Sequence, residues 1–354
     1  MLWRLLRPVR SFPATPTRRF NSTATTLSPL RILFCGSDNF SIASLRALSR
    51  LRKEDPSLIE AIDVVHRPAK RTGRGLKVFR EVPIQSAAAE ERCPTHTTDT
   101  FTGWTPPSRV DLIIAVSFGL FVPPRILNLA QYGGLNVHPS LLPDLKGPAP
   151  IQHAILRGRQ HTGVSVQTLH PSQFDGGVVL AQTRAPGIEI AKDVDGDSLT
   201  EKLGYEGAEM LVEVLKKRAF VPPLKDVGWY GGSGGPVDHA GKIRKGDQEV
   251  DFLSSSLERV FAVKKAIGDP WCTLPNGERL ILNEFSVADG SFEQTPGSIW
   301  TAQVSSKEEA LLARMACGVV LKIDKSSISG RPVGGGNQRV ISMLKARQKD
   351  GNSS

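Results

Sequence analysis

The chain has 354 residues and a basic excess, with a formal net charge of +10 at pH 7. Charged residues make up 23% of it and aromatic residues 6%, and no apolar run reaches membrane-spanning length. This composition is that of an ordinary globular protein, which excludes a membrane-spanning or low-complexity chain. The length is ample for a sizeable core and suggests two domains.

The first 27 residues form a basic, acid-free segment rich in Ser, Thr and Pro. Its five arginines are Arg4, Arg7, Arg10, Arg18 and Arg19. This is the composition of an organelle transit peptide, whereas the apolar pairs Leu2-Trp3 and Leu5-Leu6 are too short for a secretory signal. Removing the five arginines lowers the formal charge from +10 to +5. We therefore expect delivery to the mitochondrial matrix, with a disordered basic tail as the alternative.

Short apolar strands then alternate with amphipathic helices. Strands are expected at 31–35, 63–65, 111–116, 135–138, 163–169 and 178–183. Helices are expected at 41–51, 83–91, 124–130, 149–158 and 198–217. The alternation predicts an α/β fold, a Rossmann-like parallel sheet with crossover helices, over a first domain of residues 28–220. The turn after the first strand has Gly36 but not the further glycines of a dinucleotide fingerprint, so NAD is not implied.

A glycine- and proline-rich stretch, residues 221–236, has the composition of a linker. Beyond it, short apolar runs at 279–282, 297–300 and 318–323 alternate with turn residues. This pattern predicts a small, OB-like β-barrel domain over residues 237–350.

The cysteines and most histidines show no metal-binding pattern. The four cysteines are far apart and form no C-x-x-C pair, so neither a zinc site nor a disulfide framework is indicated. Six histidines match no ligand spacing and are interpreted as structural or surface residues: His66, His96, His153, His161, His170 and His239. We expect no metal.

The seventh histidine lies in a different setting. Asn136 and His138 are two residues apart at the end of an expected strand, so both side chains can point into one cleft. Ligands of open parallel sheets bind at the carboxyl ends of the strands. Asp175, 37 residues after His138, could add a carboxylate to the same cleft. Taken alone, an N-x-H pair is more often a polar strand end, so the surrounding residues must decide.

Those surrounding residues form a long motif. The sequence Asn136-Val-His138-Pro-Ser140-Leu-Leu-Pro143 is followed by Gly147-Pro-Ala-Pro-Ile-Gln152. It resembles the signature N-V-H-x-S-L-L-P-x-x-x-G-x-A-P-I-Q of the formyltransferases that use 10-formyltetrahydrofolate, and within them most closely those that act on methionyl-tRNA. The strand and turn at 31–40 are similar as well, and the resemblance extends from about residue 30 to near the carboxyl end. A motif of this length is far more specific than a lone glycine pattern.

The resemblance implies transfer of a formyl group from 10-formyltetrahydrofolate to the α-amino group of methionyl initiator tRNA, for mitochondrial translation initiation. Asn136, His138 and Asp175 match the family's catalytic residues. In this chemistry a neutral amine attacks the formyl carbon and negative charge develops on oxygen. Asn136 and His138 would donate hydrogen bonds to that oxygen, and Asp175 would relay protons through water.

The resemblance also implies binding residues for both substrates. Contacts to the folate donor are expected from Ser117, Phe118, Gly119, Leu120, Ser140 and Pro143. The segment 67–77 looks like the family's basic insertion, and its cations suit phosphate contact on a tRNA: Arg67, Lys70, Arg71, Arg74 and Lys77. A solvated charged face is the alternative for this segment. In the family the carboxyl-terminal domain contributes to tRNA binding, and we expect a monomer.

Two departures from the family pattern concern Asp175. The family often has D-T-G-D where this chain has Asp175-Gly-Gly-Val, and the loop before Asp175 is slightly longer than in bacterial relatives. Two other functions also remain open. One is formyl transfer to a small amine, such as a purine ribonucleotide or an amino sugar nucleotide; the other is a noncatalytic tRNA-binding protein.

Overall fold

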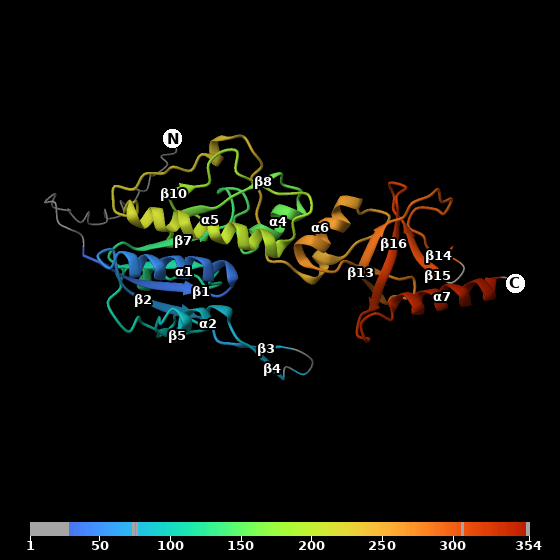
Figure 1. Ribbon diagram of the computed structural model, residues 1–354, viewed down its shortest axis with the longest axis horizontal. Helices are drawn as coiled ribbons and strands as arrows, with labels where there is room; N and C mark the ends of the chain where they lie inside the picture. Colours follow the sequence, from blue (N-terminus) through green and yellow to red (C-terminus); the bar gives the residue numbers. More distant parts are fainter. Residues whose placement is uncertain (1–27, 73–74, 76, 306–307, 352–354) are drawn as a thin grey trace, which may run out of the picture.

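The computed structural model describes residues 28–72, 75, 77–305 and 308–351. The expected transit peptide and Arg74 lie outside these residues. Figure 1 shows an α/β part at one end of the molecule and an antiparallel β part at the other, with helix α6 between them. None of the helices in these ranges is both long and apolar enough to cross a membrane.

The α/β part is built on a seven-stranded sheet in the order β10-β9-β7-β6-β1-β2-β5. Its strands are β1 (Leu30–Gly36), β2 (Ile59–His66), β5 (Thr95–Thr97), β6 (Leu112–Val116), β7 (Gly134–His138), β9 (Ser165–Thr168) and β10 (Val179–Gln182). The five strands from β7 to β5 pair in parallel, which confirms the predicted parallel-dominated fold. The edge differs from the expectation, because β9 is antiparallel to β7 and to β10.

Both faces of this sheet are buried, as is usual for a parallel sheet. The helices are α1 (Asn39–Glu54), α2 (Pro83–Glu90), α3 (Pro124–Leu127), α4 (Pro150–Leu156) and α5 (Gly196–Lys216). Alternate residues of β1 belong to different cores: Ile32 and Phe34 pack with α1, α2 and α5, whereas Leu33 and Cys35 pack with α3 and the segment before it. The alternation follows from strand geometry.

Two short antiparallel strand pairs lie outside this sheet. The expected basic loop is a hairpin of β3 (Lys70–Thr72) and β4 (Val78–Arg80), which projects from the α/β part in Figure 1. We call residues 67–80 the basic hairpin. The second pair is β8 (His161–Thr162) with β11 (Ile188–Glu189).

The expected linker, residues 221–236, is hydrogen-bonded to the α/β part. Val227 N donates to Val179 O, and the indole Nε1 of Trp229 donates to Thr183 O at 2.7 Å. It also contains a short 3-10 helix, η2 (Tyr230–Gly232). Residues 221–236 are therefore attached along the α/β part.

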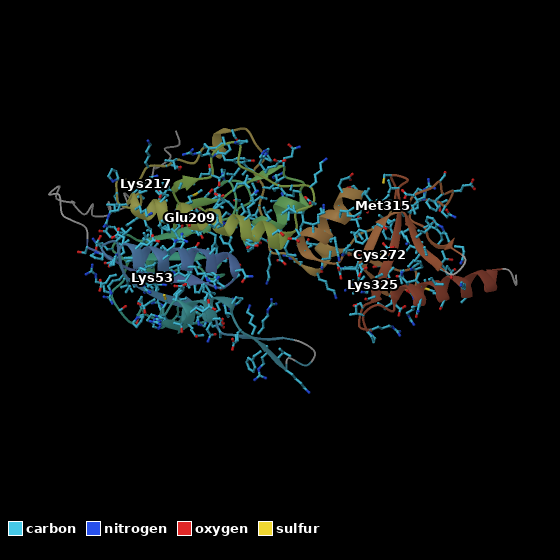
Figure 2. The ribbon with its side chains drawn as sticks, in the orientation of Figure 1. Lys53, Glu209, Lys217, Cys272, Met315 and Lys325 are labelled. Atoms are coloured by element: carbon cyan, nitrogen blue, oxygen red, sulfur yellow. The ribbon has the colours of Figure 1, made fainter. Side chains whose placement is uncertain are left out.

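The second domain is a five-stranded antiparallel sheet in the order β12-β13-β16-β15-β14, which is consistent with the predicted small β-barrel. Its elements are η3 (Lys245–Gln248), α6 (Leu257–Ile267), β12 (Trp271–Thr273), β13 (Arg279–Val287), β14 (Ile299–Ser305), β15 (Glu308–Arg314), β16 (Val320–Ile328) and α7 (Gly336–Gly351). Figure 2 shows Cys272 and Met315 in this domain, where both are buried. Helix α7 was not expected; among its described side chains, Val340, Met343 and Leu344 pack with the core of this domain.

Candidate active site

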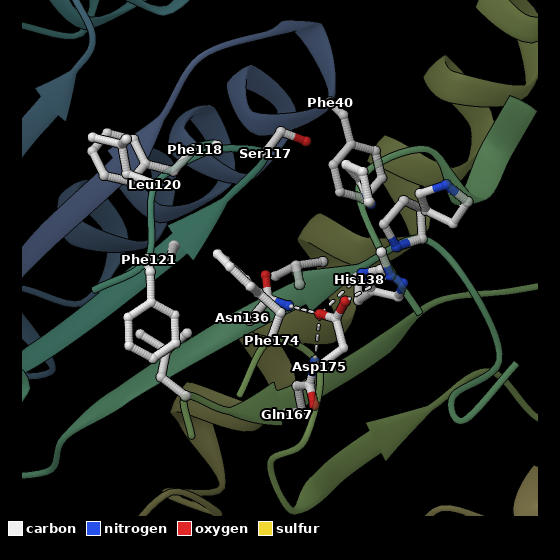
Figure 3. Close-up of a pocket in the computed structure, with 18 of the residues that line it drawn as sticks. Phe40, Ser117, Phe118, Leu120, Phe121, Asn136, His138, Gln167, Phe174 and Asp175 are labelled. Atoms are coloured by element: carbon white, nitrogen blue, oxygen red, sulfur yellow. Dashed lines mark hydrogen bonds and ion pairs between the residues drawn. The ribbon is translucent and has the colours of Figure 1, made fainter. Parts of the chain in front are cut away.

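Strand β7 carries Asn136 and His138 to the wall of a cavity of about 490 Å³ at the carboxyl end of the sheet. Figure 3 shows both side chains directed toward Asp175, which reaches them from the loop between β9 and β10. The side chains of His138 and Asp175 are only 6% and 8% exposed. The structure thus brings together the three residues that the sequence singled out.

The Asp175 carboxylate is the centre of the cluster. Its Oδ1 accepts from Asn136 Nδ2 at 3.2 Å and from Gln167 Nε2 at 3.1 Å. Its Oδ2 accepts from the backbone amide of Gly147 at 2.9 Å. His138 Nδ1 lies 3.4 Å from Oδ1. The three donated hydrogen bonds satisfy a buried carboxylate that would otherwise be costly to desolvate, and His138 Nδ1 adds an ion pair when the ring is protonated.

The partners of His138 fix a proton on its Nε2. Nε2 lies 3.0 Å from Leu145 O, and a carbonyl only accepts, so Nε2 carries a proton and donates it there. Nδ1 is then the nitrogen that faces the carboxylate. The ring is therefore held at both nitrogens, in one orientation.

Gln167 is a site residue that sequence reasoning missed. It is buried on β9 directly opposite Asn136 in the antiparallel β7–β9 pair, so its side chain meets the same carboxylate. It also accepts from the Gly177 amide at 3.1 Å. The residue was missed because no local sequence pattern indicates that β9 runs antiparallel to β7.

The loop around Asp175 has a tightly constrained backbone. Asp175 has φ of +50°, a left-handed conformation that its four polar contacts stabilise. A Cβ at Gly177 would lie 1.8 Å from Thr168 O, so only glycine fits there. The glycine that this chain shares with the D-T-G-D pattern is thus required by close packing.

The expected donor-binding residues divide into two groups. Ser117, Phe118, Gly119 and Leu120 all line the cavity, as does the neighbouring Phe121 (Figure 3). Ser140 and Pro143 are not among the lining residues, so their contact with the donor stays a prediction that this cavity does not support.

Ser140 and Pro143 instead shape the backbone behind the cavity. The Ser140 hydroxyl is buried and donates to Asp144 O at 2.6 Å, and Pro143 lies next to Gly231 of the linker. Their physical role is to support the loop that follows His138.

Aromatic side chains form an apolar wall at the cavity mouth. Phe121 and Phe174 meet edge to face with ring centroids 5.2 Å apart, and Phe174 is 66% exposed. Phe40 approaches from the start of α1 (Figure 3). An apolar wall with a few convergent polar groups is typical of a small-molecule site.

Asp38 adds a second carboxylate to the cavity lining. Its Oδ1 accepts from Ser41 N at 3.0 Å and caps α1. The Asp38 residue is exposed to solvent at the cavity, yet it lies among many protein atoms. This burial raises the pKa of Asp38 above its usual value of 3.8, against the opposing hydrogen bonds from the Ser41 amide and the Ser117 hydroxyl.

Two histidines that the sequence analysis interpreted as structural or surface residues, His170 and His239, also line the cavity. His239 lies about 100 residues after β7, where no local pattern could place it. Within the described ranges, no group of three or more His, Cys, Asp or Glu side chains is arranged to hold a metal ion.

The expected tRNA-binding residues lie apart from this cavity. Arg67 forms an ion pair with Asp99 at 2.5 Å, and the Arg71 guanidinium lies 4.8 Å from the centre of the Phe79 ring. Neither these residues nor Lys70 or Lys77 belong to the cavity lining. The structure therefore separates a basic surface from the chemical site.

Comparison with known proteins identifies the first domain. The formyl transferase family model matches residues 30–215. The chain is 36% identical over 252 residues to the mitochondrial methionyl-tRNA formyltransferase of Saccharomyces cerevisiae, covering 59% of this chain and 63% of that protein. It is 28% identical over 285 residues to the methionyl-tRNA formyltransferase of Ehrlichia canis, covering 78% and 88%. The chain thus spans about 63% of the length of the yeast relative.

Solved structures share the fold. HypX from Aquifex aeolicus in complex with tetrahydrofolic acid superposes with a TM-score of 0.51 at 17% identity, over 84% of this chain and 44% of that one. A sugar N-formyltransferase from Shewanella gives a TM-score of 0.51 at 12% identity, over 72% and 97%. At such low identity these likenesses show the fold alone.

Replacement of Asp38 by asparagine tests the electrostatics of the cavity. Asparagine keeps the helix cap but cannot titrate. The pKa of Asp38 is higher in the folded than in the unfolded chain. At pH values between the two pKa values, the folded state therefore holds more protons. The free energy of unfolding of the unmodified protein, measured relative to Asp38→Asn, should therefore fall as the pH rises above 3.8.

Asp195 provides the matched control, because it caps α5 in the same way. Its pKa is lowered, chiefly by the hydrogen bond from the Ser198 amide. Relative to Asp195→Asn, stability should be lost as the pH falls through the carboxyl range, the opposite slope. Urea unfolding across the acidic range measures both, and equal slopes for the two caps would contradict the assignment for Asp38.

Proposed function

The chain belongs to the formyl transferase family, and we propose that it transfers the formyl group of 10-formyltetrahydrofolate to the α-amino group of methionyl initiator tRNA. The observation that carries this proposal is the cluster of Asn136, His138 and Asp175 in the wall of the cavity. The similarity to methionyl-tRNA formyltransferases supports this choice of acceptor.

The geometry supports a direct transfer with no covalent enzyme intermediate. The neutral acceptor amine attacks the formyl carbon, and the formyl oxygen takes up negative charge. One hydrogen of Asn136 Nδ2 is engaged by Asp175, which leaves the second free to donate to that oxygen. With Nε2–H held by Leu145 O, His138 donates to the same oxygen from Nδ1 only as an imidazolium, protonated at both nitrogens, and the long 3.4 Å contact with Asp175 leaves that Nδ1–H able to do so.

Asp175 completes the transfer as a proton acceptor. The attacking nitrogen loses a proton, which the carboxylate receives through a water molecule. When the tetrahedral intermediate collapses, the bond from carbon to N10 breaks, and N10 takes up through water the proton that Asp175 received, which restores the carboxylate. The products are the formylated amine and tetrahydrofolate, so atoms and charge balance.

The cavity suits a folate donor. The loop Ser117–Leu120 and the Phe121–Phe174 pair offer backbone groups beside aromatic surface, which match a flat ring system with polar edges. Ser117 and Gly119 both have positive φ, at +48° and +76°, which turns this loop sharply at the end of β6. Ser117, Phe118, Gly119 and Leu120 are accordingly proposed as donor-binding residues.

We propose that the acceptor substrate is selected by two surfaces outside the cavity, the basic hairpin and the second domain. The basic hairpin offers Arg67, Lys70, Arg71, Arg74 and Lys77 to tRNA phosphates, with Arg74 outside the described residues. The second domain is proposed to add further tRNA contacts. A formyltransferase for a small amine would need neither feature, and a noncatalytic tRNA-binding protein would not need the catalytic cluster.

We also propose that residues 1–27 direct the protein to the mitochondrial matrix. Mitochondrial proteins stand among its relatives, and the five arginines without an acid suit an import signal. We further propose that the enzyme acts as a monomer.

Removing either oxyanion donor should abolish most of the transfer. The protein assayed is the chain of residues 28–354, with 10-formyltetrahydrofolate and methionyl initiator tRNA as substrates. In this protein Asn136→Ala and His138→Ala should each lower kcat about a hundredfold to a thousandfold. His161→Ala, an exposed histidine on β8, is the control and should leave kcat unchanged. If the unmodified protein binds the folate but formylates only small amines, the small-amine alternative is correct instead.

Changes in the basic hairpin should affect tRNA alone. Arg71→Ala with Arg74→Ala should raise the KM for methionyl-tRNA and reduce the slope of its salt dependence by about 1 for each phosphate that is no longer neutralised. Donor binding should be unaffected. The control pair Lys216→Ala with Lys217→Ala removes two cations at the end of α5, where Lys217 lies in Figure 2. Equal salt slopes for the two double variants would count against tRNA binding by the hairpin.

The targeting proposal can be tested with the segment itself. Residues 1–27 fused to a fluorescent protein should carry it into mitochondria. A version with the five arginines changed to glutamine should remain outside, because the electrical driving force for import acts on positive charge. Import of both versions, or of neither, would refute this role for the arginines.

A further inference from the structure

A short segment that follows the linker lies directly behind the catalytic cluster. We call residues 238–241 the strap and residues 144–149 the active-site loop. Leu145 N donates to Asp238 O at 2.8 Å, Ala240 N to Lys146 O at 2.7 Å, and Ala149 N to Ala240 O at 3.4 Å. Backbone hydrogen bonds thus join the two segments along their length.

The active-site loop supplies two of the backbone groups that hold the catalytic residues. Leu145 O accepts the proton of His138 Nε2, and Gly147 N donates to Asp175 Oδ2. Any displacement of this loop would therefore change both the orientation of the imidazole and the position of the carboxylate. Errors of about 1 Å at such positions can cost a hundredfold in rate.

The strap fits closely against this loop. Gly147 has φ of +122°, and a Cβ on it would lie 2.4 Å from Ala240 O. His153 on α4 holds the end of the strap through a 2.9 Å contact between its Nε2 and Gly241 O. His239, within the strap, itself lines the catalytic cavity.

A charged cluster locks the two segments together. Arg159 donates from Nε and Nη2 to the buried Asp144 carboxylate, at 3.1 and 3.2 Å, and from Nη2 to Asp238 at 2.5 Å. The Asp238 amide donates back to Asp144 at 2.9 Å. Arg157 also pairs with Asp238, at 2.6 Å. Paired, partly buried charges of this kind are geometrically specific.

We propose that Asp144, Arg159 and Asp238 are positioning residues that clamp the strap to the active-site loop and so hold His138 and Asp175 in reacting geometry. The strap lies beyond residue 215, where the family match ends, and four residues before η3 of the second domain. The second domain therefore begins next to the backbone that orients the catalytic groups. The kinetic part of this inference rests on the proposed function, whereas its structural part does not.

The test uses the chain of residues 28–354 with two separate substitutions: Asp238→Asn removes charge at nearly constant size, and Arg159→Gln removes charge and shortens the side chain. Asp238→Glu is the conservative variant that keeps the carboxylate. Glu209→Gln is the matched control, since it breaks an exposed ion pair with Arg50 between α5 and α1 (Figure 2). Thermal unfolding is recorded for each protein.

Two measurements are made on every variant. The first is kcat and KM for both substrates, where Asp238→Asn and Arg159→Gln should lower kcat about tenfold to a hundredfold with little change in either KM. The second needs no substrate: ¹⁵N spectra of histidine-labelled protein, with the His138 signal assigned from His138→Asn. This signal should report a fixed Nε2–H tautomer in the unmodified protein and a mixed population in both variants.

The outcomes separate the two proposals. A loss of the fixed tautomer in Asp238→Asn and Arg159→Gln, with retention in Asp238→Glu and Glu209→Gln, supports the clamp even if methionyl-tRNA proves not to be the acceptor. An unchanged His138 signal in both variants overturns it, whether activity is retained or falls through lower thermal stability. An equal loss of the tautomer in Glu209→Gln also overturns it, because the effect would then be general.

Discussion

The buried carboxylate of Asp175 is the constraint on which the catalytic region depends. An unpaired charge in such a place would cost several kcal/mol. Its hydrogen-bond donors come from β7, β9 and the active-site loop, so the charge is tolerated only when all three are assembled. The same hydrogen bonds to the carboxylate offset the cost of the left-handed backbone at Asp175 and of the close approach at Gly177. Folding of this region and formation of the site are therefore one event.

The sequence predicted the central polar residues of the candidate site, but not the residues that surround them. Strand alternation placed Asn136 and His138 on one face, and the structure agrees. Gln167 was missed because its role depends on the antiparallel register of β9, which local periodicity does not encode. His239 was missed because it comes from a segment about 100 residues away. Helix α7 was missed because few of its residues are apolar.

Many residues of the family signature in this chain hold the backbone behind the cavity rather than line the site. Ser140 and Pro143 lie behind the cavity, and Gly147 is required by contact with the strap. Only Asn136 and His138 of the first eight motif residues have side chains in contact with the Asp175 carboxylate, where we propose the chemistry. If every motif residue were taken as a ligand contact, the number of site residues would be overestimated. Many of these positions are instead specified because they fix the shape of the loop.

The strap also bears on how a large acceptor could improve the chemical step. Contacts far from the reacting atoms raise kcat only if their binding energy is used to organise the catalytic groups. The basic hairpin and the five-stranded sheet of the second domain, which we propose to bind tRNA, both lie outside the cavity, so a tRNA bound there needs a physical route inward. Leu145 and Gly147 hold His138 and Asp175 from one side and contact the strap from the other. A tRNA that steadies the second domain would steady these two backbone groups, and a small amine would not.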